Sequence, residues 1–335
     1  MSTLSALTEA AQLERLAALA RRALPAWGLD GARLAPLKYR ENAVFLVEDE
    51  GGRRAVLRVH RPGYRSDAHI RSEAAWMRAL AAAGVPTPVI LPATGGDVLV
   101  AADADGVPEP RWCDLQSWVD GTPLGTLEHG VAMDDAGLRC TYETLGEIAA
   151  RIHAHGAGWQ RPAGFERPRW DADALVGDEP AFGRFWELDS IEPARRDELL
   201  RLRDRVRERL AALGAPRLLV HGDLIPDNVF AAPDGMRVID FDDCGWSWWS
   251  FELVTSVFPL LVSGGFEAGL DGYLAGYGRV RAVPEEELEL LGPLVVARAL
   301  SYLGWPAGRP EIHSQQPIAP FLAAAVLEMA PRFLR

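Results

Sequence analysis

Two short segments in the second half of the chain carry polar residues whose types and spacing could do chemistry. In HGDLIPDNVF, Asp223 stands two residues after His221, and Asn228 stands five residues after Asp223. The segment VIDFDD that follows contains Asp240. An asparagine in a loop can serve only to bend the backbone, so its role depends on what lies beside it.

A hairpin is predicted between the two segments. Residues 229–231 and 237–239 read as short strands, and the letters PDG between them supply turn chemistry. Asn228 precedes the first strand and Asp240 follows the second, so both lie at the open end of the hairpin. Opposite side chains of a ladder start about 4.5–5.5 Å apart. The spacing therefore predicts that Asn228 and Asp240 lie close enough to share one metal ion.

These residue types indicate a particular reaction. An amide oxygen and a carboxylate suit Mg²⁺, which keeps several waters and binds substrate phosphates. Asp223 is then left to accept the proton of an attacking hydroxyl. His-x-Asp-x4-Asn, followed by an aspartate after a hairpin, is the order of base, metal-binding asparagine and metal-binding aspartate in kinases. We therefore expect phosphoryl transfer with ATP and Mg²⁺.

The elements that position these residues fall into two parts. The first third contains strand-like runs such as AVFLVEDE and RRAVLRVH, and one helix that Ser66 caps and Gly84 ends. From Met133 onward the hydrophobic pattern is helical. We expect an α+β, bilobal chain with a nucleotide-binding lobe at 1–118, including a leading helix, and a helical lobe at 119–335 with the catalytic loop and substrate site.

Composition excludes several classes of function. The chain has 335 residues and a net charge of −12, which argues against non-specific nucleic-acid binding. Its three cysteines form no CxxC pair, so neither a disulfide framework nor a zinc site is indicated. The N-terminal segment reads as an amphipathic helix rather than a signal peptide, and no run is apolar enough to span a membrane. We expect a cytoplasmic protein; the oligomeric state is not indicated.

The sequence resembles the aminoglycoside phosphotransferase superfamily from about Leu34 to about Leu303. LLVHGDLIPDNVF and VIDFDDCG are the two hallmark segments, and AVLRVHRPGYRSDAHIRSEAAWMRALAAAGVPTP and TLGEIAARIHAHG are also similar. The likeness is greatest to homoserine kinases and stress response kinase A. It implies a protein-kinase-like fold, with a small antiparallel-sheet lobe, a larger helical lobe and ATP in the cleft.

The resemblance assigns roles residue by residue. It makes Asp223 the catalytic base, Asn228 and Asp240 the metal ligands, and His221 and Asp242 supporting residues. Arg58 falls where kinases place a phosphate-binding lysine on the third strand, and Glu73 matches the helix partner of that lysine.

The sequence supports the Glu73 assignment independently. Glu73 lies on the same side of its helix as the apolar stripe formed by Ile70, Ala74, Met77 and Ala81. A carboxylate that faces a core needs a cationic partner. The alternative is a solvated glutamate at the rim of the helix.

The chain departs from the family pattern at several positions. Arg58 replaces lysine with a wider, bidentate fork, and the first hairpin lacks a glycine-rich loop at 40–43. Ile225 stands where a histidine is frequent, and Glu252 where an aspartate is usual.

Other residues receive structural interpretations. The segment LQSWVDGTPL resembles the kinase hinge that presents backbone hydrogen bonds to adenine, which implies that main-chain groups of Ser117 and Val119 bind adenine. Trp246, Trp248 and Trp249 of GWSWWSFEL read as packing for the following helix, with an aromatic substrate box as the alternative. His153 reads as core support.

The leading functional prediction is an ATP- and Mg²⁺-dependent phosphotransferase that acts on a hydroxyl of a small molecule. The acceptor would be an amino alcohol, a hydroxylated amino acid, or an amino sugar or antibiotic. Two alternatives stay open: a protein serine/threonine kinase resembling stress response kinase A, and an inactive nucleotide-binding scaffold.

Overall fold

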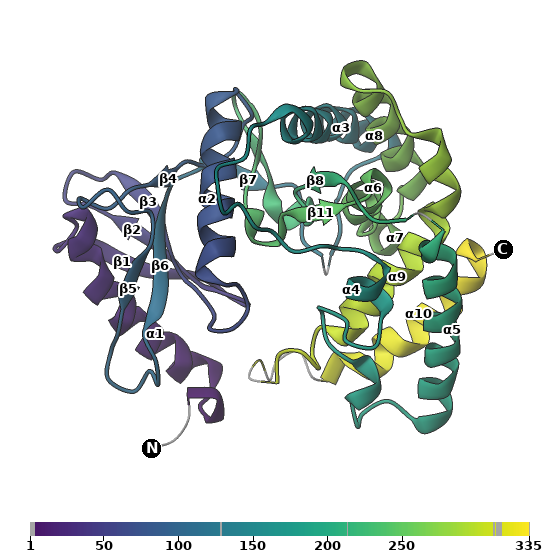
Figure 1. Ribbon diagram of the computed structural model, residues 1–335, viewed down its shortest axis with the longest axis horizontal. Coiled ribbons are helices and arrows are strands. Elements are labelled where there is room, and N and C mark those ends of the chain that lie inside the picture. Colours follow the sequence, from purple (N-terminus) through teal and green to yellow (C-terminus); the bar gives the residue numbers. More distant parts are fainter. Residues whose placement is uncertain (1–3, 128, 213, 311, 313–316, 335) are drawn as a thin grey trace. The chain divides into compact units, whose positions relative to one another are not determined.

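The computed structural model describes residues 4–127, 129–212, 214–310, 312 and 317–334 (Figure 1). The chain divides into two units. The first contains Met1–Asp120, Arg161–Glu166 and Glu311–His313, and the second contains Gly121–Gln160, Arg167–Pro310 and Ser314–Arg335. The assignment of nucleotide binding to 1–118 and of substrate binding to 119–335 stays a prediction.

An antiparallel sheet forms the centre of the first unit. Its strands follow the order β1-β2-β3-β6-β4, and β5 also pairs with β6. The strands are β1 Arg33–Tyr39, β2 Ala43–Glu48, β3 Arg54–Val59, β4 Ile90–Leu91, β5 Val100–Ala102 and β6 Arg111–Ser117. Side chains alternate between the two faces of a strand. Leu57 and its partner Leu115 therefore point to one face, and Arg58 and its partner Asp114 to the other.

Helix α1 (Glu9–Ala23) covers the apolar face of this sheet, between the short 3-10 turns Leu4–Ala6 and Leu24–Trp27. Its buried Leu16 and Leu19 share one core with Leu57 and Leu115. The predicted amphipathic N-terminal helix is confirmed; the first three residues of that segment lie outside the described residues.

Helix α2 (Asp67–Ala82) begins and ends at the predicted residues. The Ser66 side chain accepts a hydrogen bond from the His69 amide, which satisfies one of the unpaired N–H groups of the first turn. Gly84 follows with φ +79°, a left-handed conformation that glycine adopts without strain. Because Glu73 is fully buried on this helix, the solvated-rim alternative is wrong.

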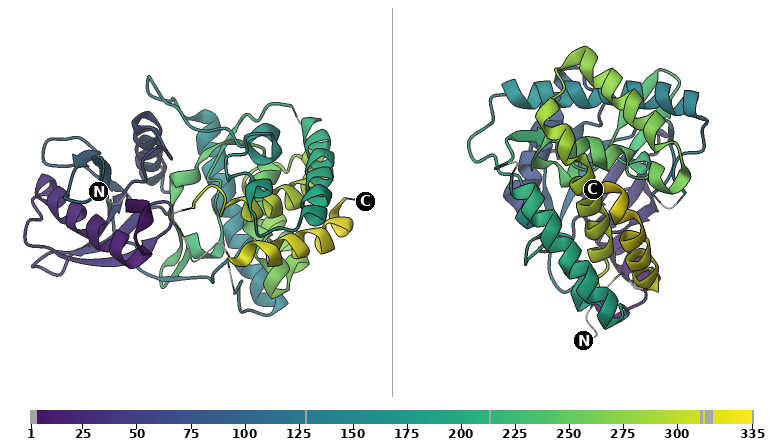
Figure 2. Two further views of the ribbon diagram at one scale, coloured as in Figure 1. Left: turned by 90° about the horizontal axis from the view of Figure 1, so that it is seen from below. Right: turned by 90° about the vertical axis from the view of Figure 1, so that its right-hand side faces the viewer.

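The second unit is mainly helical. Figure 2 shows α5, α9 and α10 side by side, and their apolar faces share one core. Its helices are α3 Asp135–Gly158, α4 Ala172–Val176, α5 Pro193–Ala211, α6 Trp249–Val257, α7 Leu260–Ser263, α8 Phe266–Val280, α9 Leu291–Gly304 and α10 Ala319–Phe333. Shorter 3-10 turns are Phe185–Glu187, Pro226–Asn228, Phe241–Asp243 and Glu285–Leu290.

Two small antiparallel sheets complete this unit. One has the order β10-β9-β7 and the other pairs β11 with β8. Their strands are β7 Thr122–Pro123, β8 Leu218–Val220, β9 Val229–Ala232, β10 Gly235–Val238 and β11 Gly245–Ser247. Trp248 and Trp249, which follow β11, are buried, so the prediction that they pack is confirmed.

Helices α3 and α8 approach each other through glycines. A Cβ atom added at Gly146 would overlap the Tyr273 carbonyl oxygen, and one added at Gly276 would overlap the Glu143 carbonyl oxygen. A Cβ atom added at Gly272 would likewise overlap the Arg139 carbonyl oxygen. The backbones of the two helices are therefore in direct contact at this crossing.

Among the described residues, no helix is both long enough and apolar enough to cross a membrane.

Candidate active site

The predicted hairpin forms, but its register differs by one residue from the expected one. Val229 pairs with Val238, and the Ile239 amide donates to the Asn228 carbonyl over 2.9 Å. Ile239 therefore stands opposite Asn228, and Asp240 is one residue further along. The prediction failed because Gly235 begins β10 instead of belonging to the turn, which makes the loop one residue shorter.

Asp223 is held through both oxygens of its carboxylate. Asn228 Nδ2 donates to Asp223 Oδ2 over 2.8 Å and to the Asp223 carbonyl over 2.9 Å. Arg298, from helix α9, donates through Nη2 to Oδ1 over 2.8 Å. The Arg298 side chain is 2% exposed, whereas the Asp223 side chain is 22% exposed. The carboxylate is thus fixed from within the unit and keeps an exposed part.

Three aromatic rings surround Arg298. Its guanidinium carbon lies 4.6 Å from the ring centre of Tyr302, 5.6 Å from that of Phe182 and 5.8 Å from that of Phe251. Aromatic faces attract a cation, most strongly where water is excluded. Although burial disfavours the charged form, Tyr302 and Asp223 raise the pKa of Arg298. The arginine is therefore a permanent cation behind the carboxylate.

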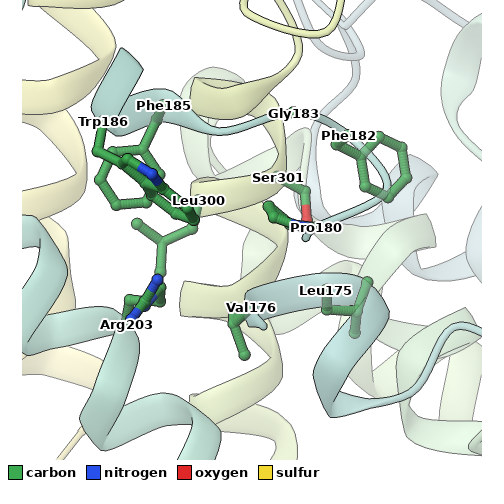
Figure 3. Close-up of a pocket in the computed structure, with 10 residues that line it drawn as sticks. All are labelled: Leu175, Val176, Pro180, Phe182, Gly183, Phe185, Trp186, Arg203, Leu300 and Ser301. Atoms are coloured by element: carbon green, nitrogen blue, oxygen red, sulfur yellow. The ribbon is translucent and has the colours of Figure 1, made fainter. Parts of the chain in front are cut away.

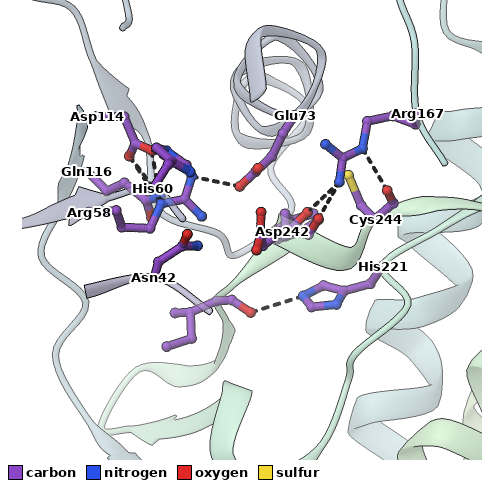
Figure 4. A network of polar contacts seen from close by, with 12 residues as sticks. Asn42, Arg58, His60, Glu73, Asp114, Gln116, Arg167, His221, Asp242 and Cys244 are labelled. Atoms are coloured by element: carbon purple, nitrogen blue, oxygen red, sulfur yellow. Dashed lines mark hydrogen bonds and ion pairs between the residues drawn. The ribbon is translucent and has the colours of Figure 1, made fainter. Parts of the chain in front are cut away.

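Asp240 has a left-handed backbone. Its φ is +67°, the only positive value at a non-glycine among the described residues. The turn after it is fastened by donors from the 167–170 segment. Arg167 donates to the carbonyls of Phe241, Asp242 and Cys244 (Figure 4), and Trp170 Nε1 donates to the Asp243 carbonyl over 2.7 Å. Four successive carbonyls are thereby satisfied, which holds Asp240 in its strained conformation.

Asn228 and Asp240 are residue types that suit a magnesium ion with few protein ligands, and their binding of such an ion stays a prediction. The amide nitrogen of Asn228 is used on Asp223, which leaves its oxygen as the atom that could bind a cation. Within the part of the chain that the structure describes, no group of three or more His, Cys, Asp or Glu residues could hold a metal by itself. Mg²⁺ commonly completes its shell with water and substrate phosphate, so one amide oxygen and one carboxylate are adequate.

The loop that carries Asp223 is held at its start by Glu252. This fully buried residue of α6 accepts hydrogen bonds from the amides of His221, over 2.5 Å, and Gly222, over 3.2 Å. His153 Nε2 lies 3.6 Å from the same carboxylate, and His153 Nδ1 lies 3.0 Å from the Tyr277 hydroxyl. Glutamate at this position therefore still anchors the loop, and His153 lies in the core as predicted.

The His221 ring joins the catalytic loop to the hairpin. Its Nε2 donates to the Ile239 carbonyl over 3.0 Å (Figure 4). Its Nδ1 accepts from the Asp223 amide over 3.2 Å. Burial lowers the pKa of His221 and of His153. Burial would raise the pKa of Glu252, but the nearby His153 and His221 and the amide of Gly222 hold it below its ordinary value. Neutral imidazoles around an ionised carboxylate suit support rather than proton transfer.

In the first unit, Arg58 and Glu73 meet as the sequence suggested. Arg58 Nη2 lies 2.8 Å from Glu73 Oε1, and both side chains are buried. A second carboxylate, Asp114, lies 2.8 Å from the same Nη2, and His60 Nε2 lies 2.6 Å from Asp114 (Figure 4). Whether this cluster binds nucleotide stays a prediction.

The stretch predicted to bind adenine is partly occupied by its own hydrogen bonds. The Ser117 amide donates to the Val89 carbonyl over 2.8 Å, and the Ser117 hydroxyl accepts from the Val89 amide over 2.9 Å. The Ser117 N–H is therefore not available to adenine. The predicted contacts would have to come from other main-chain groups of residues 117–119, including those of Val119.

A cavity of about 10 Å³ lies elsewhere in the second unit (Figure 3). Phe182, Trp186 and Ser301 are among the side chains around it, and the predicted site residues are not. Such a volume holds about one water molecule, so this cavity is too small for a substrate.

The sequence had not singled out Asp114, Arg167 or Arg298. Each contacts its partner across a long stretch of chain. Asp114 lies 56 residues from Arg58, and Arg167 and Arg298 lie 74 or more residues from the residues that they contact near Asp223 and Asp240. Asp114 had a readable signal, because a charged residue inside the strand-like run RWCDLQSWV must face something polar.

Comparison with known proteins decides the family. The model of the phosphotransferase enzyme family (APH) matches residues 34–290. The chain belongs to this family. A microcompartment-associated aminopropanol kinase has a TM-score of 0.81 and 29% identity over 95% of this phosphotransferase and 97% of its own chain.

Two further proteins are similar. An amicoumacin kinase in complex with AMP-PNP, Ca²⁺ and Ami has a TM-score of 0.73, with 17% identity over 92% of each chain, which shows the fold alone. The homoserine kinase of Azorhizobium caulinodans is 29% identical over 212 residues, 55% of this chain and 60% of its own length.

These similarities confirm several predictions. The fold is α+β and protein-kinase-like, and the enzyme is a phosphotransferase with an alcohol group as acceptor. The resemblance to aminoglycoside phosphotransferases and homoserine kinases is also confirmed.

Proposed function

We propose that this phosphotransferase transfers the γ-phosphoryl group of ATP, bound with Mg²⁺, to a hydroxyl of a small molecule. The observation that carries the proposal is the Asp223 carboxylate. Asn228 and Arg298 fix it through both oxygens, and the Asp223 side chain is still 22% exposed. A buried structural aspartate needs no exposed part, whereas a base must reach its substrate.

In this proposal the residues of the chain mainly position the reactants. Phosphoryl transfer requires little covalent help from the protein. Asp223 orients the acceptor hydroxyl and takes its proton, and Asn228 and Asp240 hold the metal. Bound Mg²⁺ would neutralise charge on the phosphates. Arg58, paired with Glu73, binds the nucleotide phosphates.

The acceptor class is inferred from similar proteins. Aminopropanol and homoserine, which occur in the names of two of them, each carry an amine and a hydroxyl. We therefore propose an amino alcohol, a hydroxylated amino acid or an amino sugar as the acceptor.

The test is a screen of aminopropanol, homoserine, choline and aminoglycosides for ATP consumption, with Asp223→Asn as the control. The asparagine keeps the size of the side chain but cannot accept a proton, so turnover should fall by about 10²–10⁴-fold. Calorimetry should show Mg-ATP binding near the wild-type affinity. Full turnover by Asp223→Asn on a confirmed acceptor would refute the mechanism.

Labelled ATP separates this proposal from a protein kinase. With a small-molecule acceptor, label should appear in a low-molecular-weight product and be absent from added polypeptides. Label on a polypeptide substrate, with no small-molecule product, would favour the protein kinase instead.

A further inference from the structure

Arg58 and Asp114 are placed together by the backbone of the sheet. They are register partners on the neighbouring strands β3 and β6. Arg58 Nε lies 3.0 Å from Asp114 Oδ2 and 3.3 Å from Oδ1, and Arg58 Nη2 lies 2.8 Å from Oδ2. Figure 4 shows the aspartate beside the guanidinium. Opposite charges directly across a ladder attract each other, so the sheet itself sets where the arginine lies.

Asp114 is a buried, ionised carboxylate with several donors around it. Its side chain is 1% exposed, His60 Nε2 lies 2.6 Å from Oδ2, and Gln116 Nε2 donates to Oδ1 over 3.2 Å. Burial alone would raise the pKa of Asp114, but the charge of Arg58 and the hydrogen bond with His60 hold it well below its ordinary value. This residue cannot turn toward water if Arg58 is lost.

The guanidinium therefore serves two carboxylates at once. Nη2 contacts Glu73 from helix α2 and Asp114 from the sheet, both at 2.8 Å, and Nε contacts Asp114 a second time. A lysine ammonium is a compact point charge on a flexible stem, without the planar fork of an arginine. It cannot reproduce the contacts that Nε and Nη2 make with these two carboxylates.

We propose that Asp114 is the positioning residue that makes an arginine, rather than a lysine, the phosphate-binding cation of this enzyme. The proposal rests on the proposed nucleotide function of Arg58. Asp114 and Arg58 form one unit, and neither can be exchanged alone.

One consequence runs against the usual expectation for a conservative substitution. Arg58→Lys, which introduces the residue that kinases place on this strand, should harm the enzyme because it leaves Asp114 buried without its main cation. The same lysine should be tolerated once Asp114→Asn has removed the extra negative charge. Asparagine keeps the shape of Asp114 and can still hydrogen bond with His60.

The experiment compares wild type, Arg58→Lys, Asp114→Asn and the double variant. Thermal unfolding and Mg-ATP affinity by calorimetry are measured for each, and neither needs the acceptor. We expect the midpoint of unfolding to fall by roughly 5 °C in Arg58→Lys, with about tenfold weaker Mg-ATP binding. The double variant should recover most of both losses.

Arg33→Lys is the matched control. Arg33 and Glu48 are also register partners of opposite charge in the same sheet, but Arg33 is 85% exposed. Exposed pairs contribute little, so this control should behave as wild type.

Additive losses in the double variant, or wild-type behaviour of Arg58→Lys, would overturn the proposal. If Arg58→Lys does not fold, we expect the double variant to fold. A double variant that also fails to fold overturns the proposal. If wild type does not bind Mg-ATP, the proposed function fails, while the coupling in thermal unfolding still decides the link between Arg58 and Asp114.

Discussion

In each unit of this phosphotransferase a buried arginine contacts an aspartate, Arg58 in the first and Arg298 in the second, and these two arginines are used in opposite ways. In the first unit the carboxylates Glu73 and Asp114, 0% and 1% exposed, hold Arg58 in place. In the second unit three aromatic rings hold Arg298, and the arginine holds Asp223, which is 22% exposed. In the first cluster the carboxylates position the cation Arg58. In the second cluster the cation Arg298 positions the carboxylate of Asp223. The difference matches a binding role for the first cluster and a chemical role for the second.

The largest effect should come from Asp240, the proposed metal ligand of the second unit. Asp240→Asn removes one charged oxygen but suits the left-handed backbone, since asparagine tolerates positive φ. We expect turnover with Mg-ATP to fall below detection, while thermal unfolding stays near that of wild type. Asp240→Ala should lose turnover as well, with an additional cost of about 1–2 kcal/mol from the backbone. Retained turnover in both variants would remove Asp240 from the metal site.

The next effect tests whether the first cluster depends on charge. Arg58→Met leaves two buried carboxylates without their shared cation, and such losses cost about 3–5 kcal/mol. In a double-mutant cycle with Glu73→Gln, measured by denaturant unfolding, the two changes should be strongly non-additive because the residues touch. Strict additivity in both unfolding free energy and ATP affinity would mean that the pair does not act as a unit.

Arg298→Met tests whether the second cluster depends on the charge of its arginine. The rings remain and Asp223 can hydrate, so we expect a smaller loss of unfolding free energy than in Arg58→Met. Turnover should fall by about 10²-fold, as when a catalytic group is misplaced by about 1 Å, with Mg-ATP affinity unchanged.

Arg309→Met is the control for Arg298. Arg309 is equally buried and lies 4.6 Å from the ring centre of Trp305, and its Nη1 donates to the backbone carbonyls of Phe182 and Trp305. The Arg309→Met substitution should leave turnover unchanged. Equal turnover losses in the two variants would show that Arg298 matters for packing alone.

The smallest effect is a difference in pH dependence. Burial lowers the pKa of His153 below 6.5, so its neutral form stabilises the fold above that pH, and this contribution is lost as the pH falls further. Each proton involved changes the unfolding free energy by up to about 1.4 kcal/mol per pH unit. The pKa of Asp114 is lowered instead, so its contribution should persist at pH 5.5.

The measurement is the unfolding free energy of wild type and His153→Gln at pH 7.5 and 5.5. The glutamine variant should lose less stability on acidification than wild type. Parallel losses in the two proteins would exclude His153 as a source of the pH dependence.

Local patterns in the sequence were sufficient for the elements that carry Asp223 and Asn228. The loop, the hairpin and helix α2 with its Ser66 cap depend on neighbours a few residues apart, and they formed as expected. The register of the hairpin was missed by one residue because Gly235 belongs to the strand, and the length of the turn sets the register of a hairpin. Pairing of β3 with β6, and packing of α9 against the catalytic loop, depend on tertiary structure, so Asp114 and Arg298 could not be paired with their partners.

The glycine crossing of α3 and α8 limits how this protein could be stabilised by engineering. Replacing a helical glycine with alanine usually gains up to about 1 kcal/mol through helix propensity. At Gly146 and Gly276 the new methyl group would meet a carbonyl oxygen of the opposite helix, and a backbone cannot relax by changing rotamer. Libraries that exchange glycine for alanine should therefore exclude these two positions, although they lie in the interiors of helices where the exchange normally succeeds.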